Sequence, residues 1–343
     1  MNESWHNHLR ACGAIFEHQH VAHFGSPEQE WAAAKTGTVL SDLSHFGLIG
    51  FAGEDTQTFL QGQLTNDVRQ VSPNRAQYSS YCTPKGRMLA NFLLWQNGGG
   101  DYLMQLPAEL QANTQKRLGM FVLRSKVKVR DAGGEWVRIG LAGSGAEALL
   151  QKHFPTLPNE PMGVANSDTM SVLRLSAERF QINLQPEQAA ALWDILKMDS
   201  TPVGASVWQW LEIRAGIPTI TAATQEHFVP QMVNYERIGG VNFKKGCYPG
   251  QEIVARTQYL GKLKRHMYLA HIASPSVPAA GDELYSADME GQASGMIVNA
   301  ERSPGGGFDV LAVIQISSAE AGPVHWKTPD GAVLELLPLP YQA

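Results

Sequence analysis

The chain has 343 residues, of which 43% are hydrophobic and 17% charged, so it is long enough for two or three domains with sizeable cores. Its net charge of −5 at pH 7 argues against bulk nucleic-acid binding. No stretch approaches the roughly 18 apolar residues of a membrane span or shows the pattern of a signal peptide. Three widely spaced cysteines, Cys12, Cys82 and Cys247, argue against a disulfide framework or zinc knuckle and favour a reducing cytoplasm.

The N-terminal segment is rich in histidine. His6, His8, His18, His20 and His23 could suggest a metal site. Residues two apart, such as His18 and His20, do not share a helix face, and polar chain ends are commonly loosely packed. We therefore expect a solvated arm here and no metal site.

Helices and strands are then predicted in mixed order. A helix begins at Ser26-Pro27, where a capping residue precedes a proline, and ends at Gly37. Further helices are predicted over 55–63, 107–118, 146–153, 186–198 and 206–214. Strands are predicted over 38–51 with a break at 41–45, and over 76–95, 101–106, 124–130, 136–141 and 169–175. This order is typical of an α+β fold rather than a strict parallel α/β wind.

The helical period disappears from Lys264 onward. Strands are predicted over 266–273, 295–300, 308–315 and 324–337, with turns such as Pro304-Gly305-Gly306 and Pro329-Asp330-Gly331 between them. We expect residues 265–343 to form a small all-β, barrel-like domain.

One cysteine stands in an unusual setting, the stretch Lys244-Lys245-Gly246-Cys247-Tyr248-Pro249-Gly250-Gln251-Glu252. Pro249 suits a first helical position, and residues 251–256 predict a short helix. The helix N-terminus and the two lysines would favour the thiolate of Cys247 over the thiol. The alternative is a buried cysteine in an ordinary turn.

The same region is basic. Residues 244–266 hold six lysines and arginines and one acidic residue. On an acidic protein such a patch indicates a small polyanionic ligand or a limited contact with a partner, and a solvated basic face is the alternative.

The stretch around Cys247 resembles the K-G-C-Y-x-G-Q-E signature of YgfZ-type folate-binding proteins, which are related to the glycine-cleavage aminomethyltransferase. The resemblance covers about residues 28–266. Further segments that resemble these proteins, in order along the chain, are Asp42-Leu43-Ser44-His45-Phe46, Leu64-Thr65-Asn66-Asp67-Val68, Ala76-Gln77-Tyr78-Ser79, Ala215-Gly216-Ile217-Pro218 and Phe228-Val229-Pro230-Gln231.

This resemblance implies a three-domain, aminomethyltransferase-like ring of α+β class with tetrahydrofolate in a central channel. The expected domains are a first α+β domain at 1–49 plus 126–225, a second at 50–125 plus 226–264 with the cysteine signature, and a C-terminal β-barrel-like domain at 265–343. The YgfZ branch is associated with iron–sulfur cluster assembly or repair in enzymes that include tRNA-thiolating ones. The resemblance thus implies a folate-binding accessory protein whose partners are iron–sulfur proteins or assembly factors.

Two departures from the parent enzyme bear on activity. Where the aminomethyltransferase has an Asp-Asp pair, this chain has Ala90 and Asn91, so aminomethyl transfer would lack a carboxylate. Where the family tends to have Glu before Ala-Gly, this chain has Arg214, which cannot accept hydrogen bonds from a pterin. Glu212 lies two positions away. We therefore expect no glycine-cleavage chemistry.

The implied site combines a reactive centre, Cys247 with Lys245, and a folate site. The folate-binding residues implied are Tyr78, Asn66, Asp67, Gln251, Glu252, Arg256 and Arg265. Tyr78 would stack on a folate ring, and the arginines, with Lys262 and Lys264, would hold the glutamate tail. Two other functions stay open: a folate-dependent one-carbon transferase or demethylase with Asp67 as base, and a non-folate scaffold that docks partners through Cys247.

Overall fold

The computed structural model describes residues 2–261 and 263–341 and mixes helices with largely antiparallel sheets, as the predicted α+β class requires. The chain forms two compact units: unit 1 comprises Met1–Leu60, Val68–Gln77 and Phe92–Trp208, and unit 2 comprises Gln61–Asp67, Tyr78–Asn91 and Gln209–Ala343. In the described part of the chain, no helix has both the length and the apolar character needed to span a membrane.

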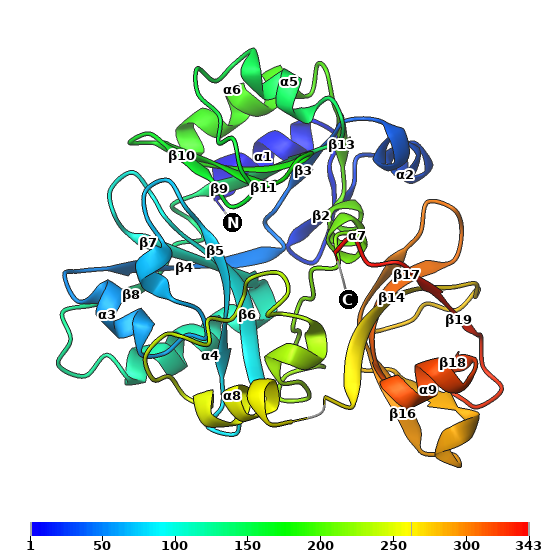
Figure 1. Cartoon of the computed structure of the whole chain (residues 1–343). Coiled ribbons are helices and arrows are strands. Elements are labelled where there is room, and N and C mark those ends of the chain that lie inside the picture. The colour runs from blue at the N-terminus through cyan, green and yellow to red at the C-terminus, as the bar shows by residue number, and fades with distance from the viewer. Residues whose placement is uncertain (1, 262, 342–343) are drawn as a thin grey trace. The chain divides into compact units, whose positions relative to one another are not determined.

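Unit 1 is built around a six-stranded sheet of order β10-β11-β12-β9-β3-β13 (Figure 1). Its strands are β3 (Val39–Asp42), β9 (Val137–Ala142), β10 (Val164–Asn166), β11 (Met170–Ser176), β12 (Arg179–Leu184) and β13 (Thr201–Val203). Neighbouring strands pair antiparallel, except that β13 pairs parallel with β3. The apolar core of this sheet includes Leu40, Ile139, Phe180 and Ile182, all fully buried.

Short helices accompany this sheet in unit 1. They are α1 (Glu3–Ala11), α2 (Pro27–Thr36), α5 (Ala146–Gln151) and α6 (Pro186–Leu196). The boundaries of α2 confirm the predicted helix between Ser26 and Gly37. Helix α7 (Ala205–Arg214) starts in unit 1 and ends in unit 2.

The N-terminal segment is not the solvated arm that the sequence predicted. Residues Glu3–Ala11 form α1, whose first turn is capped by the Asn2 side chain, which accepts a hydrogen bond from the Trp5 backbone at 3.3 Å. Trp5 and Leu9 are buried in the core of unit 1, and a hairpin of β1 (Ile15–Glu17) and β2 (His20–His23) follows. The prediction failed because two apolar residues four apart are enough to bury one face of a short polar helix.

A second sheet has the order β5-β6-β7-β4-β8. Its strands are β4 (Phe46–Ala52), β5 (Gln77–Cys82), β6 (Met88–Gln96), β7 (Tyr102–Pro107) and β8 (Lys128–Asp131), and the nearby helical elements are α3 (Thr56–Gln61), η1 (Val68–Gln70) and α4 (Ala108–Met120). The strand predicted over 124–130 begins four residues late. The chain first turns after α4, where Leu123 adopts a positive φ of 47°.

The C-terminal part of unit 2 is a curled antiparallel sheet of order β18-β15-β16-β17-β14-β19, drawn in yellow to red in Figure 1. Its strands are β14 (Arg265–Ile272), β15 (Glu283–Ser286), β16 (Ala293–Arg302), β17 (Phe308–Gln315), β18 (Val324–Trp326) and β19 (Leu334–Leu337). A bridge between His325 and Val333 brings its two edge strands together, which confirms the barrel-like prediction.

The prediction of an all-β domain is wrong at two short segments. These are the 3-10 turn η3 (Ala287–Met289) and the helix α9 (Ile316–Ala321). Helix α9 buries Ser318, whose hydroxyl donates a hydrogen bond to Asp288 at 2.9 Å. A helix of six residues is too short to produce a recognisable helical period in the sequence.

Candidate functional site

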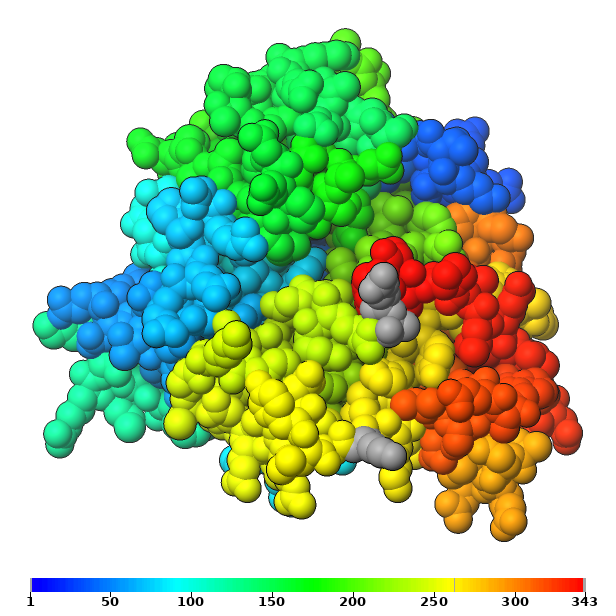
Figure 2. All heavy atoms as spheres, in the orientation of Figure 1, coloured from blue at the N-terminus to red at the C-terminus, as the bar shows by residue number. Residues whose placement is uncertain are grey.

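Cys247 lies in an exposed loop of unit 2 that leads into α8 (Gln251–Tyr259), so the interpretation as a buried cysteine is wrong. Figure 2 shows this yellow segment at the surface of the molecule. The predicted helix is present, but Pro249 does not start it. Gly250 is the N-cap, with a φ of 82° that favours glycine, and the first helical residue is Gln251.

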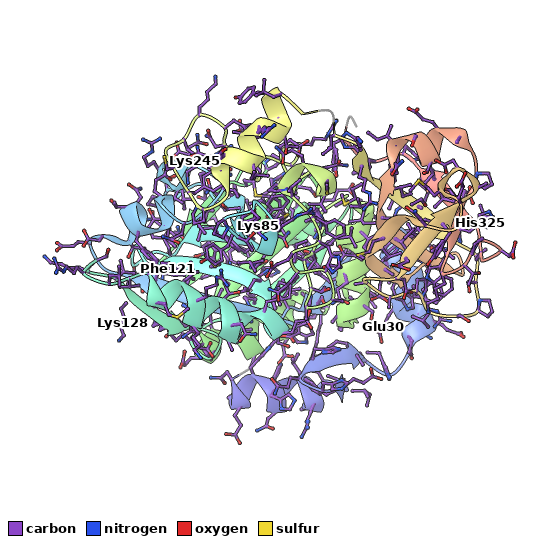
Figure 3. The ribbon with its side chains drawn as sticks, turned by 90° about the horizontal axis from the view of Figure 1, so that it is seen from below. Glu30, Lys85, Phe121, Lys128, Lys245 and His325 are labelled. Carbon is purple, nitrogen blue, oxygen red and sulfur yellow. The ribbon has the colours of Figure 1, made fainter. Side chains whose placement is uncertain are left out.

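Lys245 anchors this loop (Figure 3). Its side chain is 5% exposed, and its ammonium donates hydrogen bonds to the carbonyl oxygens of Gln61 at 2.6 Å, Leu64 at 2.5 Å and Asn66 at 3.1 Å. An ammonium has three protons to donate, so it can serve all three of these carbonyls. The ammonium also lies 5.1 Å from the ring centre of Tyr248, a cation–π distance. The local structure therefore uses Lys245 to hold the cysteine loop against residues 61–66.

Asn66 holds the next layer of the same network. Its amide nitrogen donates to the carbonyl oxygens of Tyr78 at 2.8 Å and Gly239 at 2.7 Å, and its amide oxygen accepts the Asp67 backbone N–H at 2.9 Å. Asp67 accepts a further hydrogen bond from the Gln61 side chain at 3.0 Å. The side chain of Asn66 thus bonds only to backbone groups among these contacts. It connects residues 61–66, which Lys245 contacts, to strand β5.

Tyr78 presents a half-buried ring on β5. Its ring centre lies 6.5 Å from that of Tyr235, at an interplanar angle of 54°. The Tyr235 hydroxyl donates to the Ser79 carbonyl at 2.9 Å, which fixes that ring beside the strand. Gly240 allows the close approach, since a Cβ there would lie 2.3 Å from the Tyr235 ring.

Helix α8 carries three more of the predicted residues. Gln251 turns toward the loop and donates to the Lys245 carbonyl at 3.2 Å, whereas Glu252 and Arg256 are exposed. Arg265 is half-buried at the start of β14. Within the described part of the chain, neither Arg256 nor Arg265 forms an ion pair.

The predicted site is therefore partly assembled. Hydrogen bonds connect the segments of Asn66, Asp67, Tyr78, Lys245 and Gln251 within unit 2. In the described residues, no hydrogen bond or ion pair joins the Arg265 side chain to this network. Of the two lysines expected on the same basic patch, Lys264 is exposed and Lys262 lies outside the described residues.

Burial separates Cys82 chemically from Cys247. Cys82 ends β5 and is 1% exposed, and its sulfur lies 3.9 Å from the Ser80 hydroxyl. Burial raises the pKa of the Cys82 thiol to about 12, because an apolar environment disfavours the thiolate. Burial likewise raises the pKa of Tyr248 above its usual range, so that ring stays neutral under Lys245.

Asn91, one of the two residues expected to replace the acid pair of the parent enzyme, bonds to the backbone. Its amide nitrogen donates to the Pro218 carbonyl at 2.6 Å, and its amide oxygen accepts the Ile220 N–H at 2.8 Å. A carboxylate could accept from Ile220 but could not donate to Pro218. The amide is therefore matched to the backbone that it contacts.

Arg214 faces a buried acid of the C-terminal sheet. Its guanidinium lies 3.7 Å from the carboxylate of Asp309, which is 4% exposed. The same carboxylate accepts a hydrogen bond from the Trp210 indole at 2.8 Å and lies 2.8 Å from His271 Nδ1. This arrangement gives Arg214 a partner within unit 2.

Unit 1 contains a polar cavity of about 190 Å³ that was not predicted from the sequence. Its lining includes Trp5, Asp42, Ser44 and Arg138. The buried Asp42 carboxylate accepts hydrogen bonds from the Trp5 indole at 2.8 Å and the Ser44 backbone at 3.2 Å, and burial raises its pKa. Burial lowers the pKa of Arg138 to about 10. Besides the family-like segment at residues 42–46, the sequence offered one signal, an arginine inside the otherwise apolar strand β9, which indicates a buried charge with a specific partner.

Comparison with known proteins places these observations in a family. Residues 5–242 match the family model described as the GCVT N-terminal domain. A tRNA-modifying protein YgfZ from Shigella boydii serotype 4 (strain Sb227) is 32% identical over 320 residues, covering 92% of this chain and 97% of the relative. The protein of the same name from Cronobacter sakazakii (strain ATCC BAA-894) is 32% identical over 322 residues, covering 92% and 96%.

A solved structure shares the fold. The glycine cleavage system aminomethyltransferase T from Bartonella henselae matches with a TM-score of 0.79, covering 100% of this chain and 98% of that chain. Its sequence identity is 16%, so this likeness concerns the fold alone.

Proposed function

This chain belongs to the YgfZ family of proteins with a GCVT N-terminal domain, and from that premise we propose that it is a folate-binding accessory protein with Cys247 as its reactive group. Its relatives are named tRNA-modifying proteins. We propose that this chain supports tRNA modification indirectly, by assisting the assembly or repair of iron–sulfur clusters in modifying enzymes. The net charge of −5 favours this indirect route over direct contact with tRNA.

The observation that carries the proposal is that the Cys247 sulfur is accessible while the backbone of its loop is held in place. The sulfur is exposed, whereas the loop is held by the buried Lys245 ammonium through three carbonyls. A fixed backbone lowers the entropy lost when the sulfur meets a reaction partner. One cysteine cannot hold a cluster, since clusters take four protein ligands, so Cys247 would contact sulfur or iron carried by another protein only transiently.

Three side chains on unit 2 have the chemistry that a reduced folate would need. Tyr78 offers a half-buried aromatic face, and Arg256 and Arg265 offer guanidiniums without an acidic partner in the described chain. Guanidinium groups pair with carboxylates through two parallel hydrogen bonds, so these arginines would hold the glutamate tail while Tyr78 would stack on a ring. When bound, tetrahydrofolate would supply one-carbon or redox chemistry. We propose that Asn66 and Lys245 position the site, and that Lys245 does not take part in catalysis.

The surroundings of Asn91 support an accessory role rather than aminomethyl transfer. Its amide is committed to the backbone at Pro218 and Ile220, so this position offers no carboxylate to a substrate amine. We also expect a reducing compartment such as the cytoplasm, because Cys12, Cys82 and Cys247 are all free thiols.

Complementation tests the role of the cysteine. An Escherichia coli strain lacking its own YgfZ would express this chain or its Cys247→Ser variant, and thiolated nucleosides in total tRNA would be measured by mass spectrometry. We expect the unchanged chain to restore thiolation and Cys247→Ser to lose at least about 90% of that gain. Equal soluble protein and an equal urea midpoint would show that the variant folds. Full restoration by Cys247→Ser would overturn the proposal.

Calorimetric titration with tetrahydrofolate tests the ligand separately. We expect binding that weakens about tenfold for Arg256→Gln and for Tyr78→Ala, corresponding to about 1.4 kcal/mol each. No binding at millimolar ligand would favour the scaffold without folate. Formation of methylene-folate from a methylamine donor, surviving Cys247→Ala, would favour the one-carbon transferase.

A further inference from the structure

A second cysteine of the chain lies in a cluster of side chains on unit 1. His8 belongs to α1, Cys12 is the C-cap of that helix, and Asp194 belongs to α6. The Cys12 sulfur lies 3.6 Å from His8 Nε2 and 3.9 Å from Asp194 Oδ1, and His8 Nε2 lies 3.3 Å from the same carboxylate oxygen. Three different ligand types thus converge on one point, although 182 residues separate Cys12 from Asp194.

Apolar packing fixes this cluster in place. Trp5 is buried and meets Trp193 edge to face, with ring centres 5.4 Å apart, which holds α1 against α6. The imidazole of His8 stacks on Trp5 at 5.8 Å and 21°, so its ring plane is set by a buried neighbour. His8 and Cys12 are four residues apart, a spacing that places two side chains on one helical face. The side chains of His8 and Asp194 are 21% and 48% exposed, so an ion can reach the cluster from solvent.

The distances match the edges of a tetrahedron around a metal. Zinc with bonds of about 2.3 Å to sulfur and about 2.0 to 2.1 Å to nitrogen and oxygen holds neighbouring ligand atoms roughly 3.3 to 3.6 Å apart. The separations of 3.3 and 3.6 Å fall in this range. The third, 3.9 Å, shortens with a small rotation of the exposed Asp194 side chain. We infer that His8, Cys12 and Asp194 form a binding site for a zinc-like divalent ion, with the fourth position open to water or an exogenous ligand.

Lys197 brings a positive charge to the cluster. Its ammonium lies 2.6 Å from Asp194 Oδ1 and 3.6 Å from the Cys12 sulfur. It balances part of the negative charge that a carboxylate and a thiolate bring together. On binding, the ion takes the electron pairs of the three ligand atoms, the Cys12 thiol proton leaves to the buffer, and the ammonium moves away. Lys197 is 38% exposed, so it can make that movement into solvent.

Cobalt titration of the full chain tests the site, in a Cys247→Ser background that leaves Cys12 as the accessible thiol. We expect one equivalent of Co²⁺ to produce a thiolate-to-cobalt absorption band that Zn²⁺ removes. The band should disappear with Cys12→Ser. Both His8→Ala and Asp194→Asn should weaken affinity at least about tenfold, the lower end of what even an indirect partner of a metal site contributes. Circular dichroism would confirm that these substitutions preserve the fold.

Two control variants sharpen the outcome. Substituting His18 and His20, whose rings stack 6.4 Å apart elsewhere in unit 1, should leave the affinity unchanged. Lys197→Met should keep or raise it, because no ammonium has to be displaced. A missing thiolate band, a band insensitive to His8→Ala and Asp194→Asn, or weaker binding by Lys197→Met would overturn the inference and leave only a hydrogen-bonded cluster.

Discussion

Cys247 in unit 2 and Cys12 in unit 1 are accessible cysteines held in opposite ways. In the Cys247 loop the stabilising contacts go to the backbone, through the buried Lys245 ammonium. None of the hydrogen bonds in the described chain involves the Cys247 sulfur. At Cys12 the contacts go to the sulfur itself, from His8, Asp194 and Lys197.

The difference separates two uses of a thiol. A sulfur that is exposed on a fixed loop is suited to react with another molecule, because no neighbouring group is hydrogen-bonded to it. A sulfur surrounded by an imidazole and a carboxylate is suited to act as one ligand among several. Cys82, buried at the end of β5, has neither use and packs as a small apolar residue.

Alkylation of the native protein should show the largest effect. At pH 8 a thiol pKa of about 12 leaves only about one Cys82 thiolate in ten thousand, and burial also blocks the reagent. We expect iodoacetamide to modify Cys247 at least about a thousandfold faster than Cys82, measured by peptide mass spectrometry over time. Because the raised pKa belongs to the folded state, this protection should persist as the pH rises for as long as the protein stays folded.

The same experiment sharpens the comparison between the two accessible cysteines. Zn²⁺ should slow alkylation of Cys12 and leave the rate at Cys247 unchanged. Comparable rates at Cys82 and Cys247 in folded protein would contradict the burial of β5, and zinc protection of Cys247 instead of Cys12 would reverse the assignment of roles.

Replacement of the buried lysine should have the next largest effect. Lys245→Met removes the donor from three carbonyl oxygens and leaves them poorly solvated, which should lower the free energy of unfolding by about 3 kcal/mol. Urea unfolding followed by tryptophan fluorescence would measure the loss.

Lys244 provides a matched control one residue away. It is exposed, so Lys244→Met should change the free energy of unfolding by no more than about 0.5 kcal/mol. Equal effects at the two positions would mean that the Cys247 loop is not held through Lys245.

Much of the fold was predictable because strands and helices of ordinary length leave a period in the sequence. The strands β7, β9 and β17 begin within one residue of their predicted starts. Strand β4 begins at Phe46, directly after the break that was predicted at 41–45. Two of the segments that were not predicted, α1 and α9, are short helices with few apolar residues. Their formation depends on packing against distant parts of the chain, which no local pattern records.

The sequence indicated candidate residues for the site but not the contacts that their side chains make, and the roles of these residues stay a prediction. The signature around Cys247 selected Lys245 as a catalytic partner, yet its ammonium is used by the carbonyls of residues 61, 64 and 66. A lysine beside a cysteine looks the same in sequence whether it is exposed or buried. Of the cluster at Cys12, the sequence offered only His8 as a possible metal ligand, since Asp194 comes from a helix far along the chain. The three-domain boundaries stay a prediction.

The smallest of the three effects concerns the turn before α8. Gly250 has a φ of 82°, and a Cβ added there would lie 2.4 Å from the Thr83 carbonyl oxygen and 2.7 Å from Gly86 Cα. Gly250→Ala should therefore lower the free energy of unfolding by about 2 kcal/mol, partly from the left-handed backbone and partly from the overlap. Gly246 lies in the same loop with nothing within 4 Å of an added Cβ, so Gly246→Ala should cost less than about 0.5 kcal/mol. If both variants cost the same in urea unfolding, the close contact of α8 with the β5–β6 turn would not be what fixes the backbone behind Cys247.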